Sequence, residues 1–90
     1  MLKLNVTGQF KKDRRRCIKR GLDMSLLNTV VNTLLIPAPL PAINKDHPLN
    51  GNWGNKQECH IQPDWLLIYR IDGDELLLYR TGTHSDLFRE

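Results

Sequence analysis

Three histidines and one aspartate in the second half of the chain are the side chains best suited to acid–base chemistry. His60, Asp64 and His84 stand at the ends of predicted strands, and His47 lies in a long polar loop before them. Imidazole titrates near neutral pH, so a pair of histidines can supply a proton acceptor and a proton donor, each contributing roughly 10²–10⁴ in rate. The clustering therefore indicates a general acid–base site, whereas a lone surface histidine usually has no function.

The same side chains could instead bind a metal ion. His60 and Asp64, with Cys59 adjacent and His84 across the sheet, offer donor atoms of the kinds that zinc accepts. The spacing argues against such a site, because no CxxC or HExxH is present and the neighbours Cys59 and His60 point to opposite faces of a strand. We expect no metal and no other cofactor, with Cys59 in the core facing the helices and His60 on the open face.

Trp65, Phe88 and Arg80 are the candidate substrate-binding residues. An aromatic ring could stack on an RNA base, and the guanidinium could stabilise phosphate charge in a transition state. Each residue also has a structural alternative. Large aromatic side chains most often fill cores, and an arginine on a strand is just as often one half of an ion pair.

The positions of these side chains depend on a predicted three-strand meander over about residues 55–81. Two apolar runs, 66–69 and 76–79, have the length of strands, and Asp72-Gly73 between them is a strong hairpin signal. The segment Gln62-Pro63-Asp64 predicts a second tight turn, because proline fixes φ and aspartate bonds its own backbone.

In such a meander, the end of the first strand, the start of the second and the end of the third lie at one edge of the sheet. We therefore expect His60, Asp64 and the segment 81–84 to converge in space. The meander says nothing about His47, which leads into the opposite end of the first meander strand.

The rest of the chain predicts one strand, two helices and their connections in a single domain of 90 residues. We expect a strand at about 1–6, helices at about 8–20 and 23–36, a loop at 37–54 and a C-terminal turn at 82–90. This order predicts an α+β domain in which an N-terminal strand and a helical hairpin pack on an antiparallel sheet and leave its other face open.

Caps and apolar positions define the two helices. Thr7 and Asp23 are suited to begin them, and Gly21 to end the first in a left-handed conformation. The side chains expected to be buried are Leu2, Leu4 and Val6 in the strand, Phe10, Cys17 and Ile18 in the first helix, and Leu26, Leu27, Val30, Val31, Leu34 and Leu35 in the second.

Charge is concentrated in the first helix. The chain has 13 Lys and Arg against 10 Asp and Glu, a net charge of +3, and seven of the basic side chains lie within residues 11–20. This segment could follow a phosphate backbone, contact an acidic protein segment, or simply be a solvated helix face. Two cysteines far apart, no signal peptide and no apolar run that could span a bilayer predict a reduced cytoplasmic protein without a membrane segment.

Three motifs resemble the YafQ-type toxins of the RelE/ParE superfamily, the toxic halves of bacterial type II toxin–antitoxin systems. They are residues 46–51 (DHPLNG), 58–69 (ECHIQPDWLLIY) and 80–88 (RTGTHSDLF). The resemblance covers essentially the whole chain in length and element order. It is specific from His47 to Phe88, whereas the helices match only in kind.

The resemblance implies a RelE-like microbial ribonuclease fold and a metal-independent endoribonuclease that cuts messenger RNA on the translating ribosome and arrests growth. It places catalytic positions on His47, His60, Asp64 and His84, and positions that shape the site on Trp65 and Phe88. The implied reaction is attack by the RNA 2′-hydroxyl on its own 3′-phosphate. We expect His84 to be the acid and His60 or Asp64 the base, with His47 assisting at the phosphate.

The resemblance also implies a cognate antitoxin, whose acidic or amphipathic segment wraps the toxin, and contact with promoter DNA only through the toxin–antitoxin complex. The basic helix is a candidate contact for the antitoxin or for ribosomal RNA. Two alternatives remain open. A ParE-like toxin directed at gyrase would lack this set of histidines, and a catalytically silent RNA- or antitoxin-binding module could keep the side chains without a working geometry.

Overall fold

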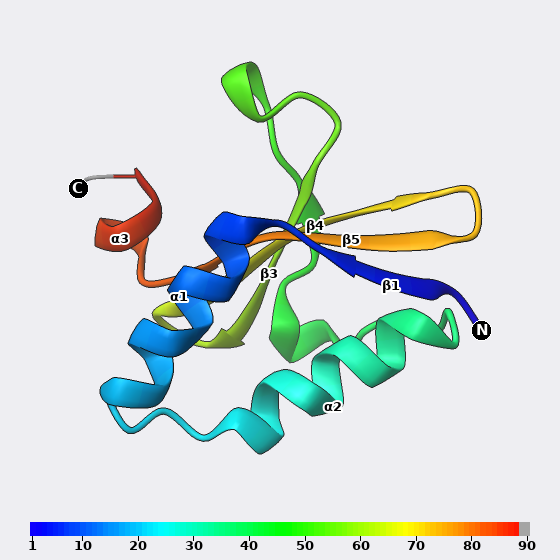
Figure 1. Ribbon diagram of the computed structural model, residues 1–90. Helices are drawn as coiled ribbons and strands as arrows, with labels where there is room; N and C mark the ends of the chain where they lie inside the picture. Colours follow the sequence, from blue (N-terminus) through cyan, green and yellow to red (C-terminus); the bar gives the residue numbers. More distant parts are fainter. Residues whose placement is uncertain (89–90) are drawn as a thin grey trace.

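A five-stranded sheet forms the centre of the fold, and two long helices pack on one of its faces (Figure 1). The computed structural model describes residues 1–88 of the chain. Its elements are β1 (Lys3–Val6), α1 (Gly8–Lys19), α2 (Met24–Leu35), a 3₁₀ turn (Ala42–Asn44), β2 (His47–Pro48), a second 3₁₀ turn (Gly51–Trp53), β3 (Gln57–Gln62), β4 (Trp65–Asp72), β5 (Glu75–Gly82) and α3 (His84–Phe88). The α+β class expected from the sequence is confirmed.

The strands are ordered β1-β5-β4-β3-β2. β3, β4 and β5 form the predicted antiparallel meander. β1 differs from the expectation of a purely antiparallel sheet, because it lies parallel to β5, with Lys3 opposite Glu75. β2 also differs, since it is a short strand inside the segment 37–54 that was predicted as loop. At the C-terminus, the predicted turn contains α3, and residues 89–90 of that prediction lie outside the described residues.

The main core lies between the helices and the sheet. Its buried members are Phe10, Cys17, Leu27, Val30, Val31, Leu34, Cys59, Trp65, Leu67, Tyr69, Leu76 and Leu78. Cys59 faces the helices as predicted. Three residues expected in the core are instead exposed: Ile18 by 46%, Leu4 by 51%, and Leu26.

Geometry explains these three exceptions. α1 contacts the sheet through Phe10, Asp13 and Cys17, a narrow stripe spaced by three and four residues, so Ile18 points to one side of it. Leu26 borders an open groove beside α2 that Thr33 and Leu40 also line. Leu4 does face the helices, but it borders an open groove between α1 and α2 because β1 is an edge strand.

The predicted helix ends are confirmed. Thr7 Oγ1 accepts the Phe10 N–H at 2.9 Å, and Asp23 Oδ1 accepts the Ser25 N–H at 2.9 Å. Gly21 has a φ of +79° and follows the last turn of α1. There its N–H bonds Ile18 O at 3.0 Å, and the next N–H, of Leu22, bonds Cys17 O at 3.1 Å, which closes α1.

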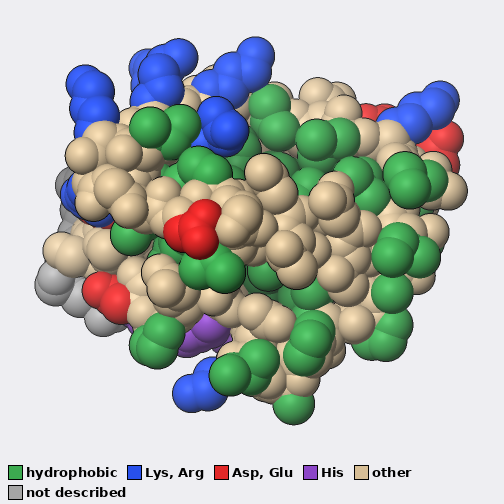
Figure 2. All heavy atoms as spheres, turned by 90° about the horizontal axis from the view of Figure 1, so that it is seen from below, with side chains coloured by type: hydrophobic (Ala, Val, Ile, Leu, Met, Phe, Trp, Pro, Cys, Tyr) green, Lys and Arg blue, Asp and Glu red, His purple; other side chains and the backbone are tan. Residues whose placement is uncertain are grey.

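Basic side chains gather at one edge of the face seen from the α2 side, and histidine is visible at the opposite edge (Figure 2). The exposed basic residues of α1 are Lys11, Lys12, Arg14, Arg15 and Lys19. They could therefore meet an anionic partner without occupying the histidine side of the molecule. Among residues 1–88, no helix is both long enough and apolar enough to cross a membrane.

Candidate active site

The predicted convergence of the meander ends is confirmed by the distances among three side chains. The rings of His60 and His84 lie 5.7 Å apart between centroids, in an edge-on arrangement. His84 Nδ1 lies 2.6 Å from Asp64 Oδ1. His60 comes from the end of β3, Asp64 from the β3–β4 turn and His84 from the first position of α3, which begins one residue after β5.

His47 joins this group through β2. The two-residue strand pairs antiparallel with β3 and sets His47 opposite Glu58. The His47 and His60 ring centroids are then 6.5 Å apart. All three histidines thus lie on one side of the sheet, and the short strand supplies the loop geometry that the meander could not predict.

Glu58 is the functional candidate to which the sequence analysis gave no role. Its side chain is 7% exposed and lies between two imidazoles, with Oε1 at 3.2 Å from His47 Nε2 and 3.4 Å from His60 Nε2. The available signal was its spacing, because residues two apart on a strand share a face and Glu58 precedes His60 by two positions. A carboxylate in this position stabilises either imidazole when it carries a proton.

Asp64 holds His84 through two hydrogen bonds to the same oxygen. Asp64 Oδ1 accepts the His84 backbone N–H at 3.0 Å and faces the ring Nδ1 at 2.6 Å. The backbone bond first, and the ring bond second, lower the pKa of the Asp64 carboxyl below its ordinary value. Because the ionised carboxylate can only accept, Nδ1 of His84 carries the proton and Nε2 is left for other partners.

The structure corrects the substrate-binding interpretation of Trp65. The side chain is 2% exposed and belongs to the core on the helix side of the sheet. Its Nε1 donates to Thr81 Oγ1 at 2.9 Å, and that hydroxyl donates in turn to Leu66 O at 2.7 Å. Trp65 therefore cannot stack on a base, and it acts on the site only by holding the strands that carry it.

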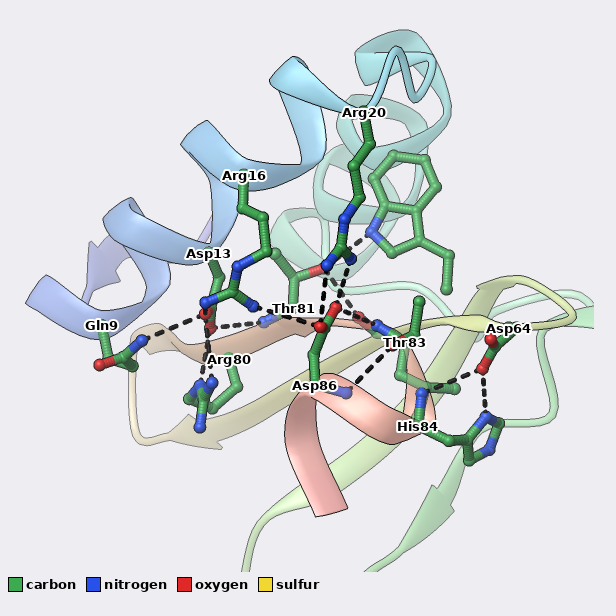
Figure 3. A network of polar contacts seen from close by, with 12 residues as sticks. Gln9, Asp13, Arg16, Arg20, Asp64, Arg80, Thr81, Thr83, His84 and Asp86 are labelled. Atoms are coloured by element: carbon green, nitrogen blue, oxygen red, sulfur yellow. Dashed lines mark hydrogen bonds and ion pairs between the residues drawn. The ribbon is translucent and has the colours of Figure 1, made fainter. Parts of the chain in front are cut away.

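Arg80 forms an ion pair, which is the structural alternative to the predicted contact with phosphate. It donates from Nε to Asp13 Oδ2 at 2.7 Å and from Nη2 to Asp13 Oδ1 at 3.2 Å, and this pairing raises the pKa of Arg80 (Figure 3). Asp13 is fully buried in α1 and also accepts the Thr81 N–H at 3.3 Å. The guanidinium is thereby committed to joining α1 to β5, beyond the point where β1 ends.

Phe88 is the aromatic prediction that does border the histidines, with its ring centroid 6.4 Å from that of His84. Its ring also packs edge-on against Trp53 at 5.6 Å, a residue from the predicted loop. A second, smaller apolar cluster supports this side of the sheet and includes Leu66, Ile68 and Leu87. The face expected to be open is therefore partly covered by α3 and by the 3₁₀ turn at Gly51–Trp53.

Two further features of the site concern ligands. A cavity of about 500 Å³ lies beside His60, lined by Ile43, Asn44, Lys45, Ile61, Gln62 and Pro63, and this volume is in the range of small-ligand pockets. Within residues 1–88, one set of side chains could hold a metal ion: donor atoms of His47, Glu58 and His60 all lie within 4.8 Å of one another. Two nitrogens and one carboxylate oxygen suit zinc or copper.

Comparison with known proteins places this geometry in context. Residues 2–89 match the family model described as bacterial toxin of type II toxin-antitoxin system, YafQ. The mRNA interferase toxin YafQ of Escherichia coli K12 is 45% identical over 87 residues, which cover 94% of each chain. A crystal structure of a copper-bound mutant toxin from Helicobacter pylori superposes with a TM-score of 0.94 at 46% identity, covering 98% of this chain and 100% of that one. The E. coli DinJ-YafQ complex gives a TM-score of 0.90 at 40% identity, with 98% and 99% covered.

Proposed function

The chain belongs to the YafQ family of type II toxin–antitoxin toxins and is an mRNA interferase, an endoribonuclease, and we propose that it cuts messenger RNA on the translating ribosome without a metal ion. The observation that carries this proposal is the edge-on pair of His60 and His84, 5.7 Å apart between ring centroids and flanked by two carboxylates. Translation and growth would stop as message is lost.

The two histidines take opposite roles in the proposed reaction. His60 donates from Nδ1 to Pro63 O at 3.3 Å, which leaves Nε2 as the atom that removes the proton from the RNA 2′-hydroxyl. The 2′-oxygen then attacks the adjacent phosphorus, and the bond from phosphorus to the 5′-oxygen breaks. His84 gives the proton on Nε2 to that leaving oxygen, so the products are a 2′,3′-cyclic phosphate and a 5′-hydroxyl.

The carboxylates of Asp64 and Glu58 stabilise the protonated forms of these histidines in the proposed reaction. The lowered pKa of Asp64 makes it a weak base at neutral pH, so we assign the base to His60 and give Asp64 the task of stabilising protonated His84. Glu58 stabilises the imidazolium that forms when His60 takes its proton. His47, on the other side of Glu58, would assist at the phosphate by exchanging its Nε2 contact with Glu58 Oε1 for one with a phosphate oxygen.

This division of work supports the proposed metal independence. Two imidazoles provide the proton acceptor and the proton donor, so no step requires a metal-bound water. At about 1.36 kcal/mol per tenfold, two groups worth roughly 10²–10⁴ each would lower the barrier by about 5–11 kcal/mol.

An antitoxin partner is supported by the E. coli structures in which YafQ is bound to DinJ. For this chain we propose a cognate antitoxin of its own, with the exposed basic residues of α1 as a contact for it or for ribosomal RNA. Promoter DNA would be bound only through the toxin–antitoxin complex. Because messenger RNA on translating ribosomes is the proposed substrate, the proposed location is the cytoplasm.

The test is mapping of messenger RNA 5′ ends after purified protein is added to a translation reaction. Parallel arms contain His84→Ala, naked RNA without ribosomes, and EDTA with the free magnesium restored to support translation. Cuts that need ribosomes, persist after removal of trace metals and vanish in His84→Ala support the proposal. Cuts on naked RNA would remove the ribosome requirement, and no cuts by folded protein would favour a silent binding module.

A further inference from the structure

The short helix α3 depends on one carboxylate for its position. It has five residues, too few to be stable alone, and it begins with His84. Asp86 Oδ2 accepts the Thr83 N–H at 3.0 Å, and Thr83 Oγ1 accepts the Asp86 N–H at 3.0 Å. This reciprocal pair is a capping box, and it fixes where the helix starts and therefore where His84 leaves the backbone.

The same carboxylate is also held by two arginines far from α3 in the sequence, Arg16 in the last turn of α1 and Arg20, the residue that caps the C-terminus of α1. Arg20 donates from Nη1 to Asp86 Oδ2 at 2.6 Å and from Nη2 to Asp86 Oδ1 at 3.0 Å, while Arg16 Nη1 lies 3.6 Å from Oδ1 (Figure 3). A two-pronged guanidinium–carboxylate pair fixes direction as well as distance. The Asp86 side chain is 13% exposed, and the arginine bond is the main cause of its strongly lowered pKa.

The end of β5 adds a third constraint on Asp86. A Cβ built on Gly82 would lie 2.8 Å from Asp86 Oδ2 and 3.0 Å from its Cβ, and Gly82 has a φ of +155°. Only glycine lets the strand approach the carboxylate this closely. Asp86 is therefore clamped between α1, the end of β5 and the first turn of α3.

We propose that Arg20 is a positioning residue for RNA cleavage: through Asp86 it fixes α3 and so orients His84 against Asp64 and His60. Arg20 itself bonds neither histidine. This inference rests on the proposed role of His84 in cleavage. The proposal therefore connects a residue at the C-terminal end of α1 to proton transfer by a side chain of α3.

The first test is the single-turnover cleavage rate on programmed ribosomes at saturating protein. Arg20→Ala should lower this rate roughly 10- to 100-fold without weakening the affinity for ribosomes, because misplacement of a catalytic group by about 1 Å has an effect of this order. Arg20→Lys should recover part of the rate, since lysine keeps the charge but not the two-pronged geometry. Arg70→Ala is the matched control, because Arg70 also pairs with an aspartate, Asp72, but lies on β4 outside the basic surface of α1 and makes no contact with Asp86.

A double-mutant cycle tests the path through Asp86. Asp86→Asn keeps an oxygen for the Thr83 N–H but removes the charge that binds Arg20. The double variant Arg20→Ala with Asp86→Asn should then be no slower than the slower single variant. Rates that multiply independently would overturn the proposal.

A second measurement does not need nuclease activity. The pKa of Asp64, followed by ¹³C NMR of its carboxyl carbon, should rise toward its ordinary value in Arg20→Ala as His84 moves away, and should stay lowered in Arg70→Ala. If the wild-type protein cuts no RNA, the proposed function fails, yet this arm still decides whether Arg20 positions His84. Should Arg20→Ala lose its fold by circular dichroism, Arg20→Lys carries the same test. A wild-type rate together with a wild-type Asp64 pKa in the folded variant overturns the proposal.

Discussion

The two sides of the central sheet are built from the same strands but do different work. On β3, Cys59 points to the helices and is fully buried, whereas its neighbours Glu58 and His60 point to the other side and form a polar cluster. The helix side holds the larger apolar core, and the histidine side rests on a small apolar base around Leu66 and Ile68. The larger core is therefore on one side and the proposed chemistry on the other, so single substitutions should separate stability from activity.

His60→Ala should give the largest change in activity. Removing the proposed base should lower the cleavage rate by roughly 10²–10⁴, because one general acid–base group contributes about that much. The free energy of unfolding should change by less than about 1 kcal/mol, since the ring is not part of the main core. Ribosome-coupled cleavage and urea unfolding measure the two quantities on the same preparation. A large loss of stability with full activity per folded molecule would reverse the proposed separation.

Leu67→Ala on the helix side should show the opposite behaviour. Leu67 is fully buried, so its truncation should lower the free energy of unfolding by roughly 2–5 kcal/mol. The rate per folded molecule should stay near that of the wild type. Ile71→Ala is the matched control on the same strand, because Ile71 is 39% exposed and should lose far less stability. Equal losses in both variants would contradict the assignment of the core to the helix side.

Glu58→Gln sharpens the comparison within β3. The substitution keeps the shape of the side chain but removes the charge between His47 and His60. We expect the cleavage rate to fall about tenfold, equivalent to about 1.4 kcal/mol in the barrier. A thermal melt should show little change. An unchanged rate would mean that Glu58 serves packing alone and that the imidazoles act without it.

Much of this division was visible in the sequence, and the reason is local. Two tight turns fix the meander, and the meander brings His60, Asp64 and His84 close together. The turn at Pro63-Asp64 lies within the predicted segment, whereas the other was predicted one residue too early: Asp72 pairs with Glu75, so the turn residues are Gly73-Asp74. Alternation on β3 then puts Cys59 and His60 on opposite sides. Both inferences need only neighbouring residues and the period of a strand.

The parts that could not be predicted depend on contacts between distant segments. The Asp13 carboxylate that binds Arg80 lies 67 residues away in the chain. A bulge in β5 shifts its pairing with β4 by one residue, so Ile68 pairs with Arg80 but Tyr69 pairs with Leu78. Because of this shift, Thr81 rather than Arg80 contacts Trp65 on the helix side of the sheet.

The alternation of polar and apolar residues also could not predict on which face of the sheet Trp65 lies, because residues 65–69 are apolar without interruption. β2 was missed for a different reason. A two-residue strand that ends in proline has no detectable pattern, yet it delivers His47 to the site.

The smallest expected effect concerns Cys59, the nearest helix-side neighbour of His60. Burial is the main reason that the pKa of its thiol is raised to about 12. Between the unfolded value near 8.5 and the folded value, the unfolded chain loses the proton while the folded chain keeps it, so stability should fall as pH rises. Relative to Cys59→Ala, the wild type should lose about 1 kcal/mol of unfolding free energy by pH ~9.2 and nothing below pH ~7.5. Urea unfolding of both proteins at matched pH measures this difference, which should not appear between wild type and His60→Ala. A flat difference would mean that water reaches the thiol and that the helix side is less sealed than its packing indicates.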